Sequence, residues 1–424
     1  MQKHVVIVGG GFGGLNAAKG LGHCKDIKVT ILDRRNHHLF QPLLYQVSTA
    51  ALSPADIATP IRHVLSGYDN VHVLLGELQK VDLEGKTITT DFASIAFDYL
   101  ILACGAKHSY FGKNEWETFA PGLKTLEQAT EIRRRILLAF EQAERDTSTE
   151  VQKQKQTFVI VGGGPTGVEM AGSIAEIARF TLSDDFKNIN PSRTRVILIE
   201  TGPRILASFD PTLSARATRD LEKLGVHVWT NSRVTDINAD GVFIGNEFVA
   251  ASTIVWAAGV APSSMNKTLG VPLDPGGRVI VEDLMNIPGY PEIFVIGDQA
   301  HFKGVDGKPL PGLAPVATQQ GRHLAKNIKA MVAGKTPKPF RYIDKGFMAT
   351  IGRNKAIAEV GKLKLKGFIA WMAWLLVHVY FLIGFKNRVA VLLQWIWSYF
   401  THNKGARLIT NRDWRTHTGP ESET

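Results

Sequence analysis

Residues 4–14 read His-Val-Val-Ile-Val-Gly-Gly-Gly-Phe-Gly-Gly, an apolar run that ends in a glycine-rich turn. Small residues then begin a helical pattern at Leu15. A buried strand, a glycine turn and a helix in this order predict the first half of a dinucleotide-binding βαβ unit. The first glycine allows the tight turn, the second lets a pyrophosphate approach the backbone, and the third lets the helix pack on the strand. The residues expected to bind the dinucleotide here are Gly9, Gly10, Gly11, Phe12, Gly13 and Gly14.

A second apolar run at residues 28–32 completes this unit and ends in Asp33, which follows Gly14 by 19 residues. A carboxylate at the end of the second strand can accept hydrogen bonds from both hydroxyls of an adenosine ribose. The helix N-terminus faces the pyrophosphate with its N–H groups. We therefore expect Asp33, with Arg34 beside it, to bind the first dinucleotide.

The same pattern returns at residues 157–167, and its strand at residues 195–199 ends in the acid Glu200. A polar stretch at residues 182–193 is typical of an inserted loop and accounts for the longer spacing. Two units in one chain predict two dinucleotides. Glu200 would hold a 2′-hydroxyl and repel a 2′-phosphate, which favours NADH over NADPH. The expected binding residues of this unit are Gly162, Gly164, Pro165, Thr166, Gly167 and Glu200.

Three more apolar runs have the composition of buried strands. Those at residues 98–102 and 253–256 lead into small residues, among them Ala103, Gly105 and Gly259, which we expect to lie beside the cofactor at the end of each unit. The run at residues 293–296 leads into Gly297 and Asp298. Strands that alternate with helices predict an α/β fold built from two Rossmann-like domains.

With these motifs in order, residues 1 to about 330 resemble the two-dinucleotide flavoprotein family. The resemblance implies that the N-terminal unit and the Gly-Asp pair at Asp298 bind FAD. It also implies that the inserted unit binds NADH. The expected domains are a first FAD-binding part (1–112), an NADH-binding domain (113–262), a second FAD-binding part (263–335), a C-terminal membrane-anchoring region (336–410) and a polar tail (411–424).

The chain contains two cysteines, Cys24 and Cys104, and its formal net charge is +10. Residues 40–47, where a disulfide reductase would carry its redox pair, contain no cysteine. A dithiol is required to accept the electrons in such an enzyme, so disulfide reduction is excluded. We interpret both cysteines as structural and expect no metal site. No nucleic-acid-binding motif accompanies the basic surplus.

Residues 367–385 contain no Asp, Glu, Lys or Arg, and a second apolar stretch covers residues 389–400. Lysines precede the first stretch, and basic residues follow the second. Tryptophans and basic flanks favour a pair of interfacial helices over a spanning helix or a buried core helix. The first strand begins too early for a signal peptide. We therefore expect peripheral attachment to the cytoplasmic face of the inner membrane.

Four stretches, at residues 36–46, 314–321, 346–353 and 384–388, make the chain resemble the type II NADH dehydrogenase family over nearly its whole length. The resemblance implies transfer of electrons from NADH to a quinone without a proton-pumping module. The family's quinone motif is often written Ala-Gln-x-Ala-x-Gln. Here Pro315 replaces its first Gln, while Ala317 and Gln319 match. We also expect a homodimer.

Three side chains are the catalytic candidates. Gln319 is the main candidate to donate a hydrogen bond to a quinone carbonyl. Glu169, on the first turn of the second glycine-turn helix, is a candidate to contact the nicotinamide part of NADH or relay a proton. Lys345 matches a family lysine near the flavin and quinone. The remaining residues expected at the flavin are Phe40, Gln41, Pro42, Leu78, Ala314, Pro315 and Val316, with His37 less certain; His378 is assigned no catalysis. Residues 314–319 are expected to begin a helix whose N–H groups face the flavin.

Two alternatives stay open. The chain could be a flavin-bearing, NADH-responsive redox sensor or a membrane-docked interaction protein. It could also be an NADH-dependent reductase of a protein carrier. A dehydrogenase returns its electrons to quinone rapidly, whereas a sensor stalls after its flavin is reduced.

Overall fold

The computed structural model describes residues 2–305 and 307–410, so the expected polar tail lies outside the described residues. The chain packs into two compact units. Among the described residues, the first comprises residues 2–39, 58–107 and 260–345. The second comprises Phe40–Ile57, His108–Gly259 and residues 346–410. Residues 40–57 and the C-terminal region thus pack with the expected NADH-binding domain, and the cofactor of each domain stays a prediction.

The first unit is built on a six-stranded sheet with strand order β20-β21-β9-β1-β2-β5. All neighbours are parallel except β20 and β21. Val5 of the central strand is in register with Val29 on one side and Tyr99 on the other. The expected strands are confirmed as β1 (Lys3–Val8), β2 (Ile27–Asp33), β9 (Tyr99–Leu102) and β21 (Tyr290–Val295), and the edge strands are β5 (Val71–Leu75) and β20 (Asn286–Ile287).

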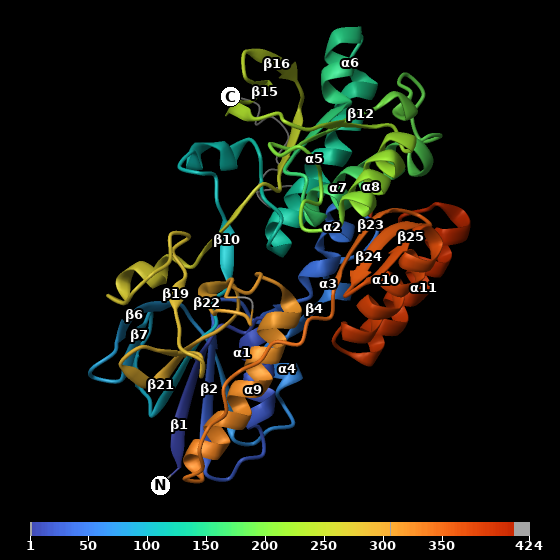
Figure 1. Cartoon of the computed structure of the whole chain (residues 1–424). Coiled ribbons are helices and arrows are strands. Elements are labelled where there is room, and N and C mark those ends of the chain that lie inside the picture. The colour runs from blue at the N-terminus through green and yellow to red at the C-terminus, as the bar shows by residue number, and fades with distance from the viewer. Residues whose placement is uncertain (1, 306, 411–424) are drawn as a thin grey trace, which may run out of the picture. The chain divides into compact units, whose positions relative to one another are not determined.

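Two helices of this unit, α1 (Phe12–Leu21) and α9 (Ala314–Val332), lie side by side (Figure 1). Glycines allow the close approach, because a Cβ atom on Gly321 would overlap the carbonyl oxygen of Gly13. The opposite side of the sheet is covered by β6 (Leu78–Asp82), β7 (Thr87–Thr90) and β8 (Ser94–Ala96), which enclose a cluster of buried aliphatic side chains. Short elements complete the unit: β3 (His37–Leu39), β4 (Ala58–Pro60), α4 (Ile61–Val64), β19 (Val279–Ile280) and β22 (Ala300–His301).

The second unit contains a four-stranded parallel sheet with strand order β13-β12-β11-β17. The predicted strands are again confirmed, as β11 (Thr157–Val161), β12 (Arg195–Ile199) and β17 (Thr253–Trp256), with β13 (Val226–Trp229) at one edge. The principal helices are α5 (Leu126–Arg145), α6 (Thr149–Lys155), α7 (Pro165–Glu176) and α8 (Pro211–Lys223). A small antiparallel sheet comprises β14 (Val234–Ile237), β15 (Gly241–Ile244) and β16 (Glu247–Ala250).

The longer spacing before Glu200 has a structural explanation. Helix α7 continues into a π-helical turn at Ile177–Thr181. Turns and bends follow, up to a short 3₁₀ helix at Pro191–Arg193. The loop expected over residues 182–193 is therefore confirmed.

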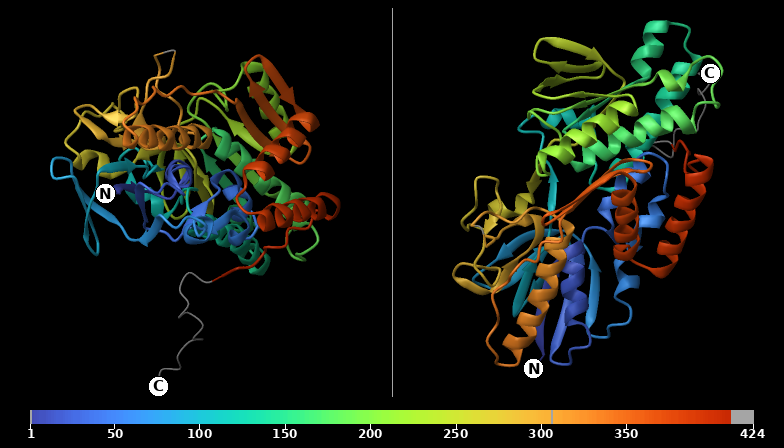
Figure 2. Two further views of the ribbon diagram at one scale, coloured as in Figure 1. Left: turned by 90° about the horizontal axis from the view of Figure 1, so that it is seen from below. Right: turned by 45° about the vertical axis from the view of Figure 1, so that its right-hand side comes forward.

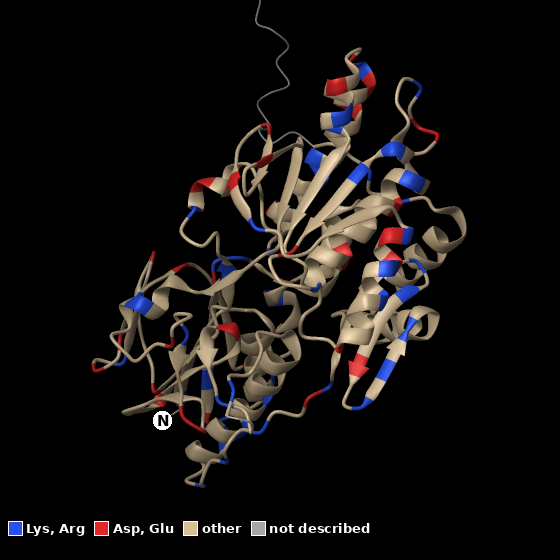
Figure 3. Ribbon diagram, turned by 45° about the horizontal axis from the view of Figure 1, so that its top comes forward, with Lys and Arg blue, Asp and Glu red and all other residues tan. Residues whose placement is uncertain are grey.

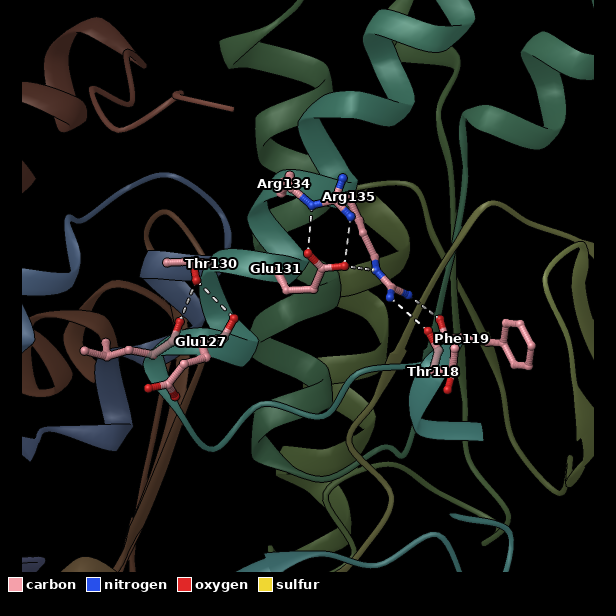
Figure 4. A network of polar contacts seen from close by, with 8 residues as sticks. Thr118, Phe119, Glu127, Thr130, Glu131, Arg134 and Arg135 are labelled. Carbon is pink, nitrogen blue, oxygen red and sulfur yellow. Dashed lines mark hydrogen bonds and ion pairs between the residues drawn. The ribbon is translucent and has the colours of Figure 1, made fainter. Parts of the chain in front are cut away.

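A network of charges fixes the N-terminal half of α5 (Figure 4). Glu131 accepts hydrogen bonds from Arg134 at 2.7 Å and from Arg135 at 2.8 Å. Arg135 also donates to the carbonyl oxygens of Phe119 at 2.6 Å and Thr118 at 2.9 Å. Burial would raise the pKa of Glu131, but these donors lower it to about 2. The network joins α5 to the segment at residues 118–119 that precedes it in the second unit.

The C-terminal part of the second unit is a three-stranded antiparallel sheet followed by two helices. Its elements are β23 (Phe347–Gly352), β24 (Lys355–Val360), β25 (Leu363–Lys366), α10 (Gly367–Phe381) and α11 (Phe385–Thr401). Gly384 has φ +88° and turns the chain between the helices. Two short helices, α2 (Leu44–Ser48) and α3 (Pro54–Ile57), lie beside them (blue and red in Figure 2).

The two expected C-terminal helices are confirmed, and they carry unusually exposed apolar side chains. Leu376 is 66% exposed, Tyr380 69%, Phe385 82% and Phe400 76%. Within the described residues, no helix combines the length and apolar character needed to cross a membrane. Each helix thus has an apolar face that the second unit itself leaves uncovered.

Candidate functional site

The first glycine turn has the geometry expected of a nucleotide cradle. Gly9 has φ +107°, a backbone conformation that favours glycine. A Cβ atom on Gly14 would overlap the carbonyl oxygen of Gly9, so the third glycine is required for close packing. A Cβ atom on Gly11 would meet nothing within 4 Å, and no side chain caps α1 at this position. An open backbone at the start of an uncapped helix fits a pyrophosphate.

The acid of this unit is held in place by the backbone. Asp33 Oδ2 accepts the Gly10 N–H at 2.6 Å, and Oδ1 accepts the Arg35 N–H at 2.7 Å. The buried ring of His38 contacts the Gly10 carbonyl oxygen through Nδ1 at 3.0 Å. The carboxylate therefore lies directly beside the glycine turn. Arg34 follows it and approaches Glu77 at 3.8 Å on the surface.

The second glycine turn repeats this geometry. Gly162 has φ +110°, and a Cβ atom on Gly167 would overlap its carbonyl oxygen. A Cβ atom on Gly164 would again meet nothing within 4 Å. Glu200 accepts the N–H groups of Gly163 and Gly202, both at 2.7 Å. Pro165 and Thr166 begin α7, whose N-terminus no side chain caps.

Several expected flavin residues meet at one end of the first sheet. The position occupied by Gly9 abuts Ala103, which follows β9, and the Ala103 N–H donates to Val8 at 2.8 Å. Gly13 lies against Ile296 and Ala317, which places the turn beside the end of β21 and the start of α9. Asp298, Ala314, Pro315, Val316 and Gly105 belong to this same end, and α9 begins at Ala314 as expected. Leu78 begins β6 of the same unit.

Gln319 makes a contact that the sequence did not reveal. Its side-chain amide donates to the Ile343 carbonyl oxygen at 2.9 Å and accepts the Ile343 N–H at 3.0 Å. Both polar atoms of the amide are therefore engaged by the backbone. A quinone carbonyl would have to displace this pair. In the present arrangement, Gln319 fixes the segment that leads to Lys345, two residues further along.

Glu169 is a partly exposed residue of the second unit whose carboxyl group lies where α7 packs against the C-terminal sheet. Its Oε1 accepts the Thr350 N–H of β23 at 3.5 Å, a long hydrogen bond. Burial raises its pKa to about 8, although the Thr350 N–H and the Trp374 indole act in the opposite direction. The carboxyl group therefore holds a proton at neutral pH. Glu169 contacts the C-terminal elements. Its position in the sequence, next to the second glycine turn, did not predict these contacts.

A cluster of aromatic and polar side chains adjoins Glu169. Burial and the charge of Glu169 raise the pKa of Tyr45, whose hydroxyl accepts a hydrogen bond from Gln46 at 2.9 Å. Gln46 accepts the Trp395 indole N–H at 2.7 Å. The Trp374 ring packs on Tyr45 with centroids 6.4 Å apart. These residues come from α2, α10 and α11, and none of them was a candidate from the sequence.

Phe40 and His378 belong to the same cluster. The two rings meet edge to face with centroids 6.2 Å apart. His378 Nδ1 contacts the Trp374 carbonyl oxygen at 2.7 Å, and burial lowers the pKa of His378 to about 4. The imidazole is thus neutral at physiological pH. Pro42 starts a 3₁₀ turn with Gln41, whose amide donates to the Lys124 carbonyl oxygen at 3.4 Å.

The remaining candidates have structural surroundings. Burial raises the pKa of Cys104 to about 12, so its thiol stays protonated, in agreement with a structural cysteine. Gly259 follows β17, and its carbonyl oxygen accepts the Ser109 N–H at 3.2 Å. Within the described residues, no three His, Cys, Asp or Glu side chains gather as metal ligands.

Comparison with known proteins agrees with this geometry. Residues 3–321 match the family model of pyridine nucleotide-disulphide oxidoreductases, and residues 345–402 match that of the NDH2 C-terminal domain. The chain is 45% identical to the type II NADH:quinone oxidoreductase NdhA of Mycobacterium tuberculosis, over 97% of this chain and 90% of that protein. It is 31% identical to an internal alternative NAD(P)H-ubiquinone oxidoreductase of Arabidopsis thaliana, over 94% and 84%.

A solved structure shares the fold. The chain aligns with NDH2 of Plasmodium falciparum in complex with NADH at a TM-score of 0.89 and 22% identity, covering 97% of this chain and 100% of that one. The sulfide:quinone oxidoreductase of Aquifex aeolicus is less similar, with a TM-score of 0.73 and 19% identity over 95% and 92%. The chain therefore belongs to the type II NADH:quinone oxidoreductases within the pyridine nucleotide-disulphide oxidoreductase family.

Proposed function

We propose that this chain is an FAD-dependent enzyme that transfers electrons from NADH to a quinone without pumping protons. One observation carries the proposal. The chain has two glycine cradles of the same geometry, and the helix of the second one bears a buried, protonated carboxyl group that contacts the C-terminal elements. Two cradles provide for two dinucleotides, and a buried acid provides for the proton that reduction of a quinone requires.

The first cradle fits FAD. The open backbone at Gly11 and the uncapped N-terminus of α1 suit its pyrophosphate, and Asp33 has carboxylate lone pairs for its ribose. Asp298 and the N-terminus of α9 lie at the same end of the sheet. When bound, FAD supplies the two-electron chemistry, so the protein has to bind and orient the reactants. The N-terminal end of α9, at Ala314–Val316, adds a positive helix dipole there.

The second cradle fits NADH better than NADPH. Glu200 is fixed by two backbone N–H groups, so its negative charge stays where a 2′-phosphate would lie. Arg204 follows closely in the chain and could relieve that repulsion. Its guanidinium instead donates to the carbonyl oxygens of Phe209 at 2.7 Å and Ala207 at 2.8 Å. Arg204 is therefore engaged by the backbone.

Glu169 provides the proton that the substrates lack. A hydride from NADH carries two electrons and one proton, whereas a quinone needs two electrons and two protons to become a quinol. The second proton comes from solvent, and an acid of the protein can relay it to the quinone. Because its pKa is about 8, the Glu169 carboxyl group is protonated at neutral pH and can release the proton with little driving force.

Gln319 and Lys345 act together in this proposal. The paired hydrogen bonds from Gln319 to Ile343 hold the segment that carries Lys345. Lys345 then places a positive charge at the acceptor site. That charge stabilises the negative charge that develops on the acceptor during its reduction. Gln319 would contact a quinone directly only after releasing Ile343.

Attachment to a membrane surface is part of the proposal. Helices α10 and α11 expose large apolar side chains, including Leu376 and Phe385. Lys364 and Lys366 belong to β25, and Lys362 lies in the turn before it. Figure 3 shows the Lys and Arg positions along the ribbon in blue. An apolar face with a basic rim suits anionic lipid. The cytoplasmic face of the inner membrane and the homodimer stay predictions.

Sedimentation with lipid vesicles tests this part. We expect co-sedimentation with anionic vesicles and its loss in the double variant Leu376→Gln, Phe385→Gln. Phe248→Gln is the matched control, because Phe248 is also an exposed aromatic residue of the second unit, at 43%. Equal binding by all three proteins would contradict the proposal.

Anaerobic stopped-flow absorbance tests the reaction. We expect NADH to bleach the bound flavin and a short-chain quinone to restore its colour rapidly. Bleaching without recovery would favour the redox sensor. Recovery with an iron–sulfur carrier protein, but not with quinone, would favour the carrier reductase.

A further inference from the structure

Trp374 is the most completely buried large side chain of the C-terminal helices. It is 1% exposed, whereas Ile369 and Leu376 on the same helix are each 66% exposed. Helix α10 therefore presents one face outward and inserts a single indole into the second unit. The proposed function gives a role to the outward face but none to this indole.

The Trp374 ring is held on several sides. It stacks on His378 with centroids 4.1 Å apart and an interplanar angle of 28°. It also contacts Trp395 of α11 at 5.5 Å and Tyr45 of α2 at 6.4 Å. Because three elements enclose the ring, its orientation is determined by packing.

The indole N–H of Trp374 is buried and forms no hydrogen bond of acceptable geometry within the described part of the chain. Leaving such a donor unpaired is unfavourable, because it has lost its hydrogen bond to water. The acid on which this N–H acts is Glu169, which among the described residues has one other donor, the distant Thr350 N–H at 3.5 Å. The buried indole N–H of Trp374 can thus donate to the desolvated Glu169 carboxyl group once that group becomes charged.

We propose that Trp374 is the positioning residue of Glu169. Its indole N–H donates a hydrogen bond to the carboxylate after Glu169 has released its proton, and it thereby links the seating of α10 to that release. The inference rests on the proposed function, in which Glu169 supplies a proton. Hydrogen bonds to a charged acceptor are shorter and stronger than those to a neutral one, so the N–H stabilises the deprotonated state selectively.

The other titratable groups around Glu169 are already engaged. The Tyr45 hydroxyl on α2 is bonded to Gln46. Glu176, two turns further along α7, accepts the Arg353 N–H at 2.5 Å. Lys404, near Glu176, contacts Ser173 Oγ at 3.2 Å. His378 lies behind the Trp374 ring and is bonded to the backbone. Trp374 is therefore the side chain best placed to respond to the charge of Glu169.

The test is an infrared titration of the full-length flavoprotein. The carboxylic band of Glu169 is first assigned by its loss in Glu169→Gln. We expect Trp374→Phe, which removes the N–H and keeps an aromatic ring, to raise the midpoint of that band by roughly half to one pH unit. The pH profile of flavin reoxidation by quinone should shift in the same direction, while bleaching by NADH is unchanged.

Trp371→Phe is the matched control. Trp371 lies on the same helix and packs on Tyr399 with centroids 5.6 Å apart. It should leave the midpoint in place, and an equal midpoint in wild type and Trp374→Phe would overturn the inference. If Trp374→Phe does not fold, benzothienylalanine at position 374 keeps the fused ring and replaces the N–H by sulfur, and the same upward shift is expected.

The two proposals can fail separately. If wild-type flavin is not reoxidised by quinone, the proposed function fails, but the infrared shift can still be measured. If quinone reduction is fast and the band does not move in either position-374 variant, only the role of Trp374 is wrong.

Discussion

The two glycine cradles have the same backbone conformation, but the helices that follow them, α1 and α7, contact different elements. Gly9 and Gly162 have φ +107° and +110°, and in both turns the third glycine abuts the carbonyl oxygen of the first. Asp33 and Glu200 each accept the N–H of the glycine that follows the first one. Backbone geometry is the part of the site that is repeated.

The residue two positions after the third glycine is where the cradles diverge. In α1 it is Asn16, which accepts a hydrogen bond from Arg322 of α9 at 2.9 Å. In α7 it is Glu169, whose carboxyl group is desolvated against β23 and α10. Both residues are partly exposed, so the same helical position is an arginine-paired amide in one unit and a proton-holding acid in the other. The residue type decides whether a proton can be held, and the neighbouring elements decide how far the pKa of the acid is shifted.

Substitution of the third glycines should have the largest effect. Gly14→Ala and Gly167→Ala force a Cβ atom onto a backbone oxygen, so we expect each to lower the free energy of unfolding by roughly 4 kcal/mol. Thermal unfolding measures this. Gly11→Ala and Gly164→Ala should keep the stability, since their Cβ atoms meet open space. Gly11→Ala should lower the FAD content and Gly164→Ala the affinity for NADH. Full retention of both ligands would contradict the assignment of the two turns as dinucleotide sites.

Removal of the acid should affect one half-reaction. We expect Glu169→Gln to slow flavin reoxidation by quinone by roughly 100- to 1,000-fold, because general acid catalysis contributes that much. Stopped-flow absorbance resolves this phase from bleaching by NADH, which should keep its rate. Asn16→Ala, at the matching position of α1, should leave the quinone phase close to wild type. An equal loss in both variants would mean that the two positions do not differ in chemistry.

The same acid should make stability depend on pH. Its pKa is about 8 in the folded protein and about 4.5 when unfolded, so the folded state holds a proton that the unfolded state releases between these values. The stability that this proton contributes is present below pH 4.5 and is lost as the pH rises through 8. Glu169→Gln should therefore exceed wild type in stability by roughly 2–3 kcal/mol at pH 9 and by little at pH 4. Denaturant unfolding at both pH values checks the sign.

Neutralising the second ribose acid should have the smallest effect. We expect Glu200→Gln to shift the preference from NADH toward NADPH by about tenfold, because one repulsive charge is removed while an acceptor stays. The ratio of kcat/KM for the two nucleotides measures it. Asp33→Asn should instead weaken FAD retention and leave that ratio unchanged. Different effects of the two substitutions would show that the two cradles bind different nucleotides.

Much of the fold could be predicted from the sequence. The strands that flank each glycine turn, the inserted loop at residues 182–193, the start of α9 at Ala314 and the two C-terminal helices are all confirmed. Each rests on a local pattern, such as a run of apolar residues or a glycine that permits positive φ. Short-range patterns of this kind specify elements before any tertiary contact forms.

The surroundings of the candidate side chains could not be predicted in this way. The pairing of Gln319 with Ile343 uses backbone atoms, which every residue has. The cluster of Tyr45, Trp374 and Trp395 around Glu169 joins segments far apart in the sequence. Even the packing of residues 40–57 with the second unit crosses the expected domain boundary.

The sequence by itself therefore determined the two nucleotide cradles and their acids, because glycine spacing and strand ends dictate backbone geometry locally. Only the tertiary structure decided that the Glu169 carboxyl group is desolvated where α7 meets β23 and α10, whereas the Asn16 amide pairs with Arg322. The physical reason is desolvation. It depends on every element that covers a side chain, so the residues adjacent in the sequence do not reveal it.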